Sequence, residues 1–313
     1  MTKIHNEANS HKTSFAKYQG FVTSKSVGAV TLQINSHVEE NITKNREILK
    51  SIIRSILYCA RQDIGLRGHY NVNTSLNKNL ENTEQTNNQG NLKELVDLLC
   101  LENEKFDKDL KSLPKNAKYT SNIVQNDILL ASSNIITQTI VKEVNEGSSV
   151  YSLIVDEARD ASTLEQMSIC IKYVHKSIIK ERFLGFVQVL KLDAQGLTHC
   201  IIEFLNAVGL DIEKCISQSY DEICDIGKSF EEIKSVIERV LVIPVSSASA
   251  ERSFSSMRRI KTYLRTSMTT TRLHNLALIS IEREFSSELL KDPTKIIDEP
   301  VLNFGPRHAS EPL

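Results

Sequence analysis

The chain has 313 residues, of which 40% are hydrophobic and 25% charged, and its formal net charge is −1. This composition predicts a globular protein with one large core or two smaller ones. It contains no early apolar run of the signal-peptide type and no apolar stretch of ~18 residues, so we expect neither secretion nor a membrane span. The near-neutral charge restricts any nucleic-acid contact to a local patch.

The six cysteines, at positions 59, 100, 170, 200, 215 and 224, are scattered and form no CxxC pair. This spacing predicts neither a zinc ribbon nor a dense set of disulfides. We therefore expect buried free thiols and a reducing compartment.

The N-terminal half of the chain is predicted to be helical. Apolar residues recur every three or four positions over residues 38–61, 91–110 and 121–144, which indicates three amphipathic helices. Between the first two, residues 71–91 hold eight asparagines among Ser, Thr, Gln and Gly. Such a composition cannot bury enough apolar area to offset the entropy of ordering, so we predict a mobile loop there.

The pattern changes at Gly147 from helical to alternating. Four short strands are predicted, over residues 150–155, 168–174, 181–189 and 214–219. A helix over Leu197–Val208 lies between the third and the fourth of them. Asp156 is predicted at the end of the first strand, and Asp221 comes shortly after the fourth.

Residues 244–284, PVSSASAERSFSSMRRIKTYLRTSMTTTRLHNLALISIERE, resemble the C-terminal region of hAT-type DNA transposases. The wider likeness, from about His5 to about Phe285, is to transposase-derived proteins of the zinc finger MYM-type 1 kind. It implies an α/β fold that is mainly α overall. A helical N-terminal domain would be followed by an incomplete ribonuclease-H-like mixed sheet and by C-terminal dimerisation helices.

The resemblance also implies domain boundaries. They are a remnant of a TTF-type zinc finger at 1–14, a helical domain of unknown function at 15–145, a partial ribonuclease-H-like core at 146–228, a dimerisation region at 229–290 and a flexible tail at 291–313. His5 and His11 resemble the histidine half of the zinc finger, but its cysteine half is absent. Because a structural zinc ion needs four ligands, we expect no metal site there.

An acidic triad of Asp156, Asp221 and Glu251 is implied by the resemblance. In nucleases of this fold, carboxylates hold two Mg²⁺ or Mn²⁺ ions about 4 Å apart. An Asp that follows a strand is also common in turns, and an acid in a first helical turn is favoured by the helix dipole. On the residues alone both interpretations stay open, and we expect no cofactor unless the triad is functional.

Only 29 residues, 222–250, separate Asp221 from Glu251. Intact hAT transposases carry a long helical insertion and further core elements in this interval, so the resemblance implies that the insertion and one core strand are missing. A short helix over residues 230–240 could still bring Glu251 near the sheet. We therefore expect a truncated, catalytically silent derivative. The alternative is a metal-dependent nuclease or transposase remnant that uses the three acids.

The C-terminal helices carry two apolar stripes. Spacing alone favours a core within one chain, whereas the resemblance implies dimerisation, either with a second copy or with related hAT-derived proteins. The candidate dimerisation residues are Phe254, Met257, Ile260, Leu264, Leu273, Leu276 and Ile281.

Basic residues cluster on the same helices, and a solvated helix face or weak DNA contact would explain them. The candidate nucleic-acid residues are Arg258, Arg259, Lys261 and Arg265. The resemblance implies a nuclear location and no membrane partner.

Overall fold

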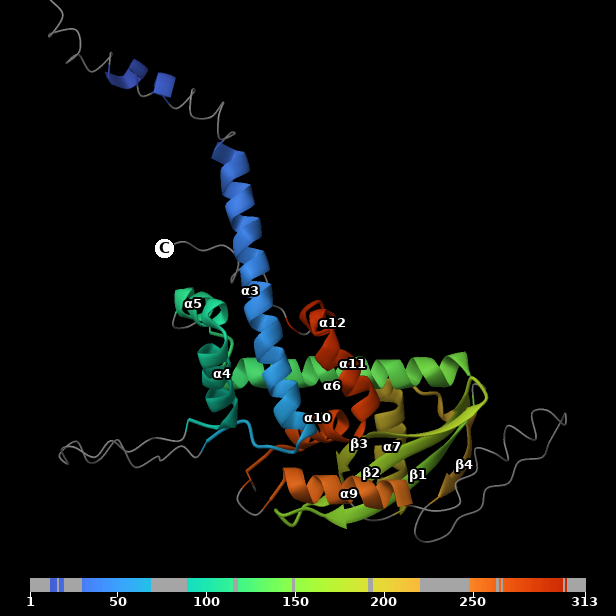
Figure 1. The fold of residues 1–313 in the computed structure, drawn as a ribbon. Coiled ribbons are helices and arrows are strands. Elements are labelled where there is room, and N and C mark those ends of the chain that lie inside the picture. Colours follow the sequence, from blue (N-terminus) through green and yellow to red (C-terminus); the bar gives the residue numbers. More distant parts are fainter. Residues whose placement is uncertain are drawn as a thin grey trace, which may run out of the picture. The chain divides into compact units, whose positions relative to one another are not determined.

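The structure, a computed structural model, describes residues 12–15, 17–19, 30–68, 89–114, 118–147, 150–190, 194–219, 248–262, 265, 267–300 and 302 (Figure 1). Two compact units divide the chain. The first comprises Met1–Leu49 and Phe304–Leu313, and the second comprises Lys50–Asn303. Helix α3, Val30–Arg61, begins in the first unit and ends in the second, and it contains the whole helix predicted over residues 38–61.

Helices α4 and α5 of the second unit replace the single helix predicted over residues 91–110. They span Asn91–Glu102 and Glu104–Ser112. Asn103 separates them because its backbone is extended and its side chain caps α5, accepting a hydrogen bond of 3.0 Å from the Phe106 N–H. An Asn at such a position satisfies a free amide at the helix start, which stabilises the break. The predicted loop at 71–91 lies mostly outside the described residues.

Helix α6, Asn122–Glu146, confirms the third predicted helix and leads into a four-stranded mixed sheet. The strands are β1 (Tyr151–Arg159), β2 (Glu165–His175), β3 (Ile178–Gln188) and β4 (Cys215–Ser219). Their order is β3-β2-β1-β4, with β4 parallel to β1 and the other pairs antiparallel. Helix α7, Ala194–Val208, confirms the helix predicted between β3 and β4.

The first three strands are longer than predicted because they are joined by tight hairpins. Lys176 and Ser177 form a two-residue turn with φ values of 52° and 61°. Two successive positive φ values match the twist of a hairpin, so the ladder continues to its tip. At the other end, β1 runs past Asp156 to Arg159, which pairs with Glu165. Asp156 therefore lies within β1 and not at its end, which corrects the prediction.

The C-terminal part of the chain forms four described helices. They are α9 (Ala248–Ile260), α10 (Thr270–Ile281), α11 (Arg283–Lys291) and α12 (Thr294–Ile297). The last of them falls in the segment predicted to be a flexible tail, and its Ile296 is fully buried. The described start of that segment is therefore packed, which corrects the prediction for residues 291–300.

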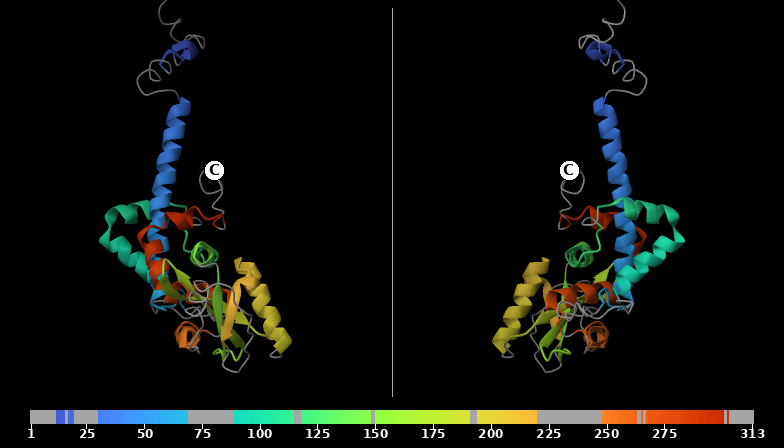
Figure 2. Two further views of the ribbon diagram at one scale, coloured as in Figure 1. Left: turned by 90° about the vertical axis from the view of Figure 1, so that its right-hand side faces the viewer. Right: turned by 90° about the vertical axis from the view of Figure 1, so that its left-hand side faces the viewer.

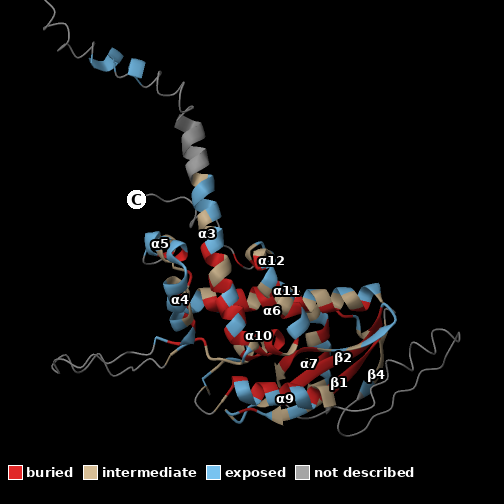
Figure 3. Ribbon diagram, in the orientation of Figure 1, coloured by how far each residue is buried: buried red, intermediate tan, exposed pale blue. Residues whose placement is uncertain are grey.

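The sheet of the second unit is covered on both faces. Helix α9 lies on one face, where the Phe254 ring stacks on Phe186 with centroids 5.9 Å apart. Helices α6 and α10 lie on the other, joined to each other by a hydrogen bond of 2.9 Å between Ser133 and Asn275. Figure 2 shows α6 and α9 nearly end-on, on opposite sides of the strands. Strand β2 is consequently buried along almost its whole length (Figure 3).

The described cysteines carry free thiols. All five described cysteines are unpaired. Cys59 and Cys170 are buried, and burial raises the pKa of their thiols to about 11 and about 12. Among the described residues, no helix combines the length and the apolar character that crossing a membrane requires.

Candidate functional site

Asp156 of the predicted triad lies on the face of the sheet that α9 covers. Its register partner on β2 is Ser168, and the Ser168 hydroxyl lies 2.6 Å from the hydroxyl of Ser253 on α9. The Asp156 carboxylate accepts a hydrogen bond of 2.8 Å from the Glu157 N–H. Burial raises the pKa of Glu157, and the charges of Glu165 and Asp156 raise it further. This end of β1 thus concentrates negative charge.

Glu251 occupies the first turn of α9 and is exposed. The helix is fixed by its apolar side, where Ala250, Phe254 and Met257 are buried. The helix that carries Glu251 therefore packs on the side of the sheet on which Asp156 lies.

Asp221 lies outside the described residues, as do the helix predicted over 230–240 and the His5 and His11 pair. The last residue of β4, Ser219, pairs with Ile154, two positions before Asp156. Among the described residues, no three His, Cys, Asp or Glu side chains gather as a metal site. That result does not test a triad that includes Asp221.

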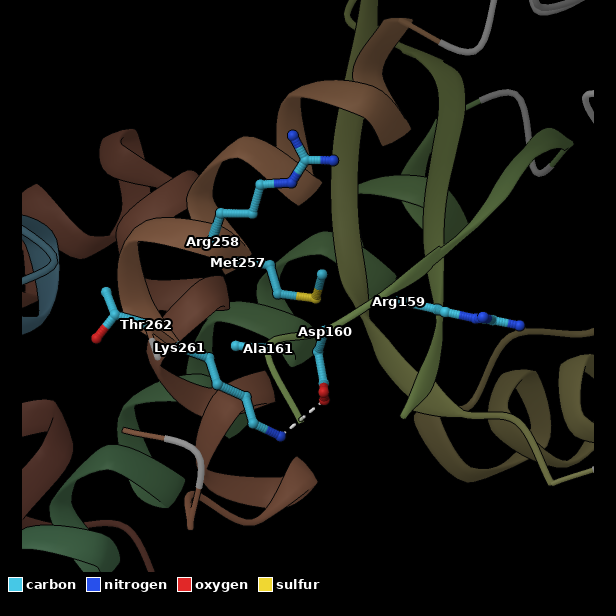
Figure 4. Close-up of a pocket in the computed structure, with 7 residues that line it drawn as sticks. All are labelled: Arg159, Asp160, Ala161, Met257, Arg258, Lys261 and Thr262. Atoms are coloured by element: carbon cyan, nitrogen blue, oxygen red, sulfur yellow. Dashed lines mark hydrogen bonds and ion pairs between the residues drawn. The ribbon is translucent and has the colours of Figure 1, made fainter. Parts of the chain in front are cut away.

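A pocket of about 390 Å³ lies between the end of β1 and the end of α9 (Figure 4). The residues that line it are Arg159, Asp160, Ala161, Met257, Arg258, Lys261 and Thr262. Its polar centre is an ion pair of 2.7 Å between Lys261 and Asp160, both of whose side chains are almost fully buried. Burial alone would raise the pKa of Asp160, but Lys261 and the N–H groups of Ser162 and Leu164 outweigh it, and the net shift is downward.

The four basic residues predicted to contact nucleic acid have different environments. Lys261 is 2% exposed and bound to Asp160, so it is not available to a surface ligand, which corrects its assignment. The Arg259 guanidinium donates to Asp63 over 2.7 Å. Arg265 donates to the carbonyl oxygens of Asp63 and Ile260. Arg258 is exposed at the mouth of the pocket, and its role in nucleic-acid contact stays a prediction.

The predicted dimerisation residues lie mainly in the core of the second unit. The buried ones are Phe254, Met257, Ile260, Leu273 and Leu276. Ile281 is half-buried, and Leu264 is outside the described residues. These buried side chains pack within one chain, as their spacing alone favours. They offer no surface to a second copy in this structure.

Several polar groups that the sequence did not single out hold the C-terminal helices to the sheet. The Glu282 carboxylate, at the junction of α10 and α11, accepts hydrogen bonds from the Phe183 N–H over 2.8 Å and from Arg182 over 3.1 Å. Arg182 also pairs with Glu284 and lies 4.6 Å above the ring of Phe285. Burial raises the pKa of Glu282 against the opposing effect of these donors. No periodicity in the sequence signals such contacts between distant segments.

Comparison with known proteins assigns most of the chain to one family. Residues 2–232 match the family described as ZMYM1/FAM200, RNase-like domain. The chain belongs to this family. Residues 226–285 match the hAT family C-terminal dimerisation region, which here includes α9, α10 and the start of α11. Both matches confirm the relationship that the sequence predicted.

One similar curated protein is the human "52 kDa repressor of the inhibitor of the protein kinase". This protein is 26% identical over 204 residues, which are 63% of this chain and 25% of the relative. The chain therefore spans about a quarter of the length of that relative. No solved structure matches the chain.

Proposed function

We propose that this hAT-derived chain acts as a protein association module, in which the C-terminal region brings two copies together and no DNA strand is cleaved. The observation that carries the proposal is the match of residues 226–285 to a dimerisation region. A two-fold dimer is the symmetry that most homo-oligomers adopt.

The exposed side of α9 is the part of this region that we assign to the interface. Its apolar side is occupied by the sheet, whereas Arg252, Ser255 and Arg258 face solvent. An interface there would join the two copies without disturbing either core. Polar interfaces of this kind are common where partners also fold alone.

Light scattering on the full chain at tens of micromolar tests this assignment. We expect a dimer that Arg258→Glu weakens at least about tenfold, because reversing an interface charge replaces attraction to a complementary charge on the other copy with repulsion. Lys142→Glu, which reverses a charge on the exposed side of α6, is the matched control and should dimerise like the wild type. A monomeric wild type would contradict the association proposal. An unchanged dimer of Arg258→Glu would contradict the α9 interface.

A metal-dependent nuclease remnant is the second candidate, favoured by the common side of the sheet that Asp156 and Glu251 share. The shortened interval between Asp221 and Glu251 argues against it. We expect no cleavage of duplex DNA with Mg²⁺ or Mn²⁺. Metal-dependent nicking that Asp156→Ala abolishes would establish the nuclease instead.

We also propose that the chain acts in the nucleus, where a hAT-derived protein with a repressor among its relatives would work. Imaging of the tagged chain in cells tests this, and exclusion from the nucleus would contradict it.

A further inference from the structure

Two arginines, far apart in the sequence, share one acceptor. Arg67 follows α3, and its Nη2 donates to the Asn126 Oδ1 over 2.9 Å. Arg272 on α10 donates its Nη1 to the same oxygen. Arg67 further donates to the Gln125 Oε1 over 3.3 Å and to the Asn122 carbonyl oxygen over 3.1 Å. Every one of these acceptors is neutral, so none of them balances the two positive charges.

No carboxylate among the described residues forms an ion pair with either guanidinium. Two other arginines differ in this respect, since Arg182 pairs with Glu282 and Arg259 with Asp63. Burial lowers the pKa of Arg67. Burial and, to a smaller extent, the charge of Arg67 together lower the pKa of Arg272 to about 10. Arg67 is exposed and Arg272 half-buried, and holding two like charges side by side with no counter-ion among the described residues costs free energy.

The helices around the two arginines strengthen the positive potential. Arg272 lies in the first turn of α10, where a basic side chain opposes the helix dipole. Asn122 and Asn126 belong to the start of α6, and neither α6 nor α10 has an acid in its first turn. The hydrogen bonds of Arg67 and Arg272 to Asn126 bring these two positive helix ends to one place. A helix start combined with arginine forks is a favourable environment for an anion.

We propose that Arg67 and Arg272 together bind an oxyanion of the phosphate class. Two guanidinium forks can donate several parallel hydrogen bonds to the oxygens of a tetrahedral anion, which a chloride ion cannot match. Asn126 holds the two forks in place and leaves their remaining N–H groups for the ligand. The phosphate can come from a free anion or from the phosphodiester backbone of a nucleic acid, and both present the same chemistry to this site.

Thermal unfolding of the full chain with inorganic phosphate tests the site. Chloride at equal ionic strength serves as the reference, since phosphate also stabilises proteins without binding to a site. We expect a rise in Tm of about 3 °C at tenfold excess over Kd. Arg67→Gln and Arg272→Gln should remove that rise, whereas Lys142→Gln, a loss of one exposed charge on α6, should keep it.

The Tm without phosphate separates ligand binding from a structural role. Because neutralising one arginine removes the repulsion between the two, we expect Arg272→Gln to unfold at an equal or higher temperature than the wild type when phosphate is absent. A lower Tm with an unchanged response to phosphate would assign Arg272 to the fold and overturn the proposal. An equal response of the wild type and both variants would do the same.

A short DNA duplex distinguishes the two sources of phosphate. Competition between the duplex and inorganic phosphate, lost in Arg272→Gln, would identify the phosphodiester backbone as the ligand. A response to phosphate without binding of the duplex would identify the free anion. Either result supports the oxyanion site, and absence of both responses would refute it.

Discussion

Lys261 and Asp160 form a buried ion pair of 2.7 Å that ties the end of α9 to the hairpin between β1 and β2. The Asp160 Oδ1 also accepts hydrogen bonds from the N–H groups of Ser162 and Leu164, and its Oδ2 accepts one from Gln166 over 3.1 Å. One carboxylate thus shapes the turn and anchors the C-terminal helices. The pair stabilises the fold only while both partners are present, because either charge alone would be buried without compensation.

The first prediction concerns this pair. Lys261→Met should lower the free energy of unfolding by about 3–5 kcal/mol, measured by urea denaturation, because Asp160 is left buried and charged. Adding Asp160→Asn should recover much of the loss, since the new amide can donate to the Gln166 Oε1, which has no hydrogen-bond partner in the described structure. Lys108→Met, which breaks an exposed pair with Glu104, should change little. Equal effects of Lys261→Met and Lys108→Met would contradict the anchoring role.

The second prediction concerns the contact between β3 and α10. A Cβ atom on Gly185 would lie 2.2 Å from the His274 Cε1 and 3.0 Å from the Phe204 Cζ. Gly185→Ala should therefore destabilise the protein by about 1–3 kcal/mol in urea denaturation. His274→Ala removes the obstructing ring, so the double variant should lose less than the sum of the single losses. If the losses of Gly185→Ala and His274→Ala simply add in the double variant, the new Cβ atom does not clash with the His274 ring.

The sequence predicted the element types well because their apolar periodicity is strong. Helix α6 and the four strands follow directly from it. The hairpin tip at Lys176 and Ser177 was missed because neither residue is Gly or Asn, the usual signals for positive φ. The stripes of α9 and α10 have the same spacing in a core and in an interface, so only the fold could decide between them.

Sites that join distant segments could not be predicted from the sequence, for a different reason. Arg67 and Arg272 lie on elements with no local signal in common, since Arg67 follows α3 and Arg272 belongs to α10. The side of the sheet that Asp156 and Glu251 share was foreseen only through the resemblance to a family. Spacing alone gave no reason to pair a strand residue with the start of a later helix.

The third prediction concerns pH. Burial lowers the pKa of His274 to about 4, below the ordinary value of 6.5. The unfolded chain therefore binds a proton before the folded protein does, so the contribution of His274 is fully present above pH 6.5 and is lost as the pH falls toward 4. The free energy of unfolding should fall by up to about 1.4 kcal/mol per pH unit in this range. It should fall less steeply in His274→Gln, while His199→Gln, which removes an exposed histidine, should keep the wild-type slope. A wild-type slope in His274→Gln would contradict the assignment.

The last prediction separates core from interface on α10. Leu276 is 7% exposed and lies beside the fully buried Leu273 and Ala277. Leu276→Ala should therefore lower the free energy of unfolding by about 2–5 kcal/mol in urea denaturation. Because the side chain packs inside its own protomer, the dimer constant of the folded fraction in light scattering should stay within about threefold of the wild-type value. The opposite result, a weakened dimer with unchanged unfolding, would place Leu276 at the interface that the resemblance implies and would reject the exposed side of α9.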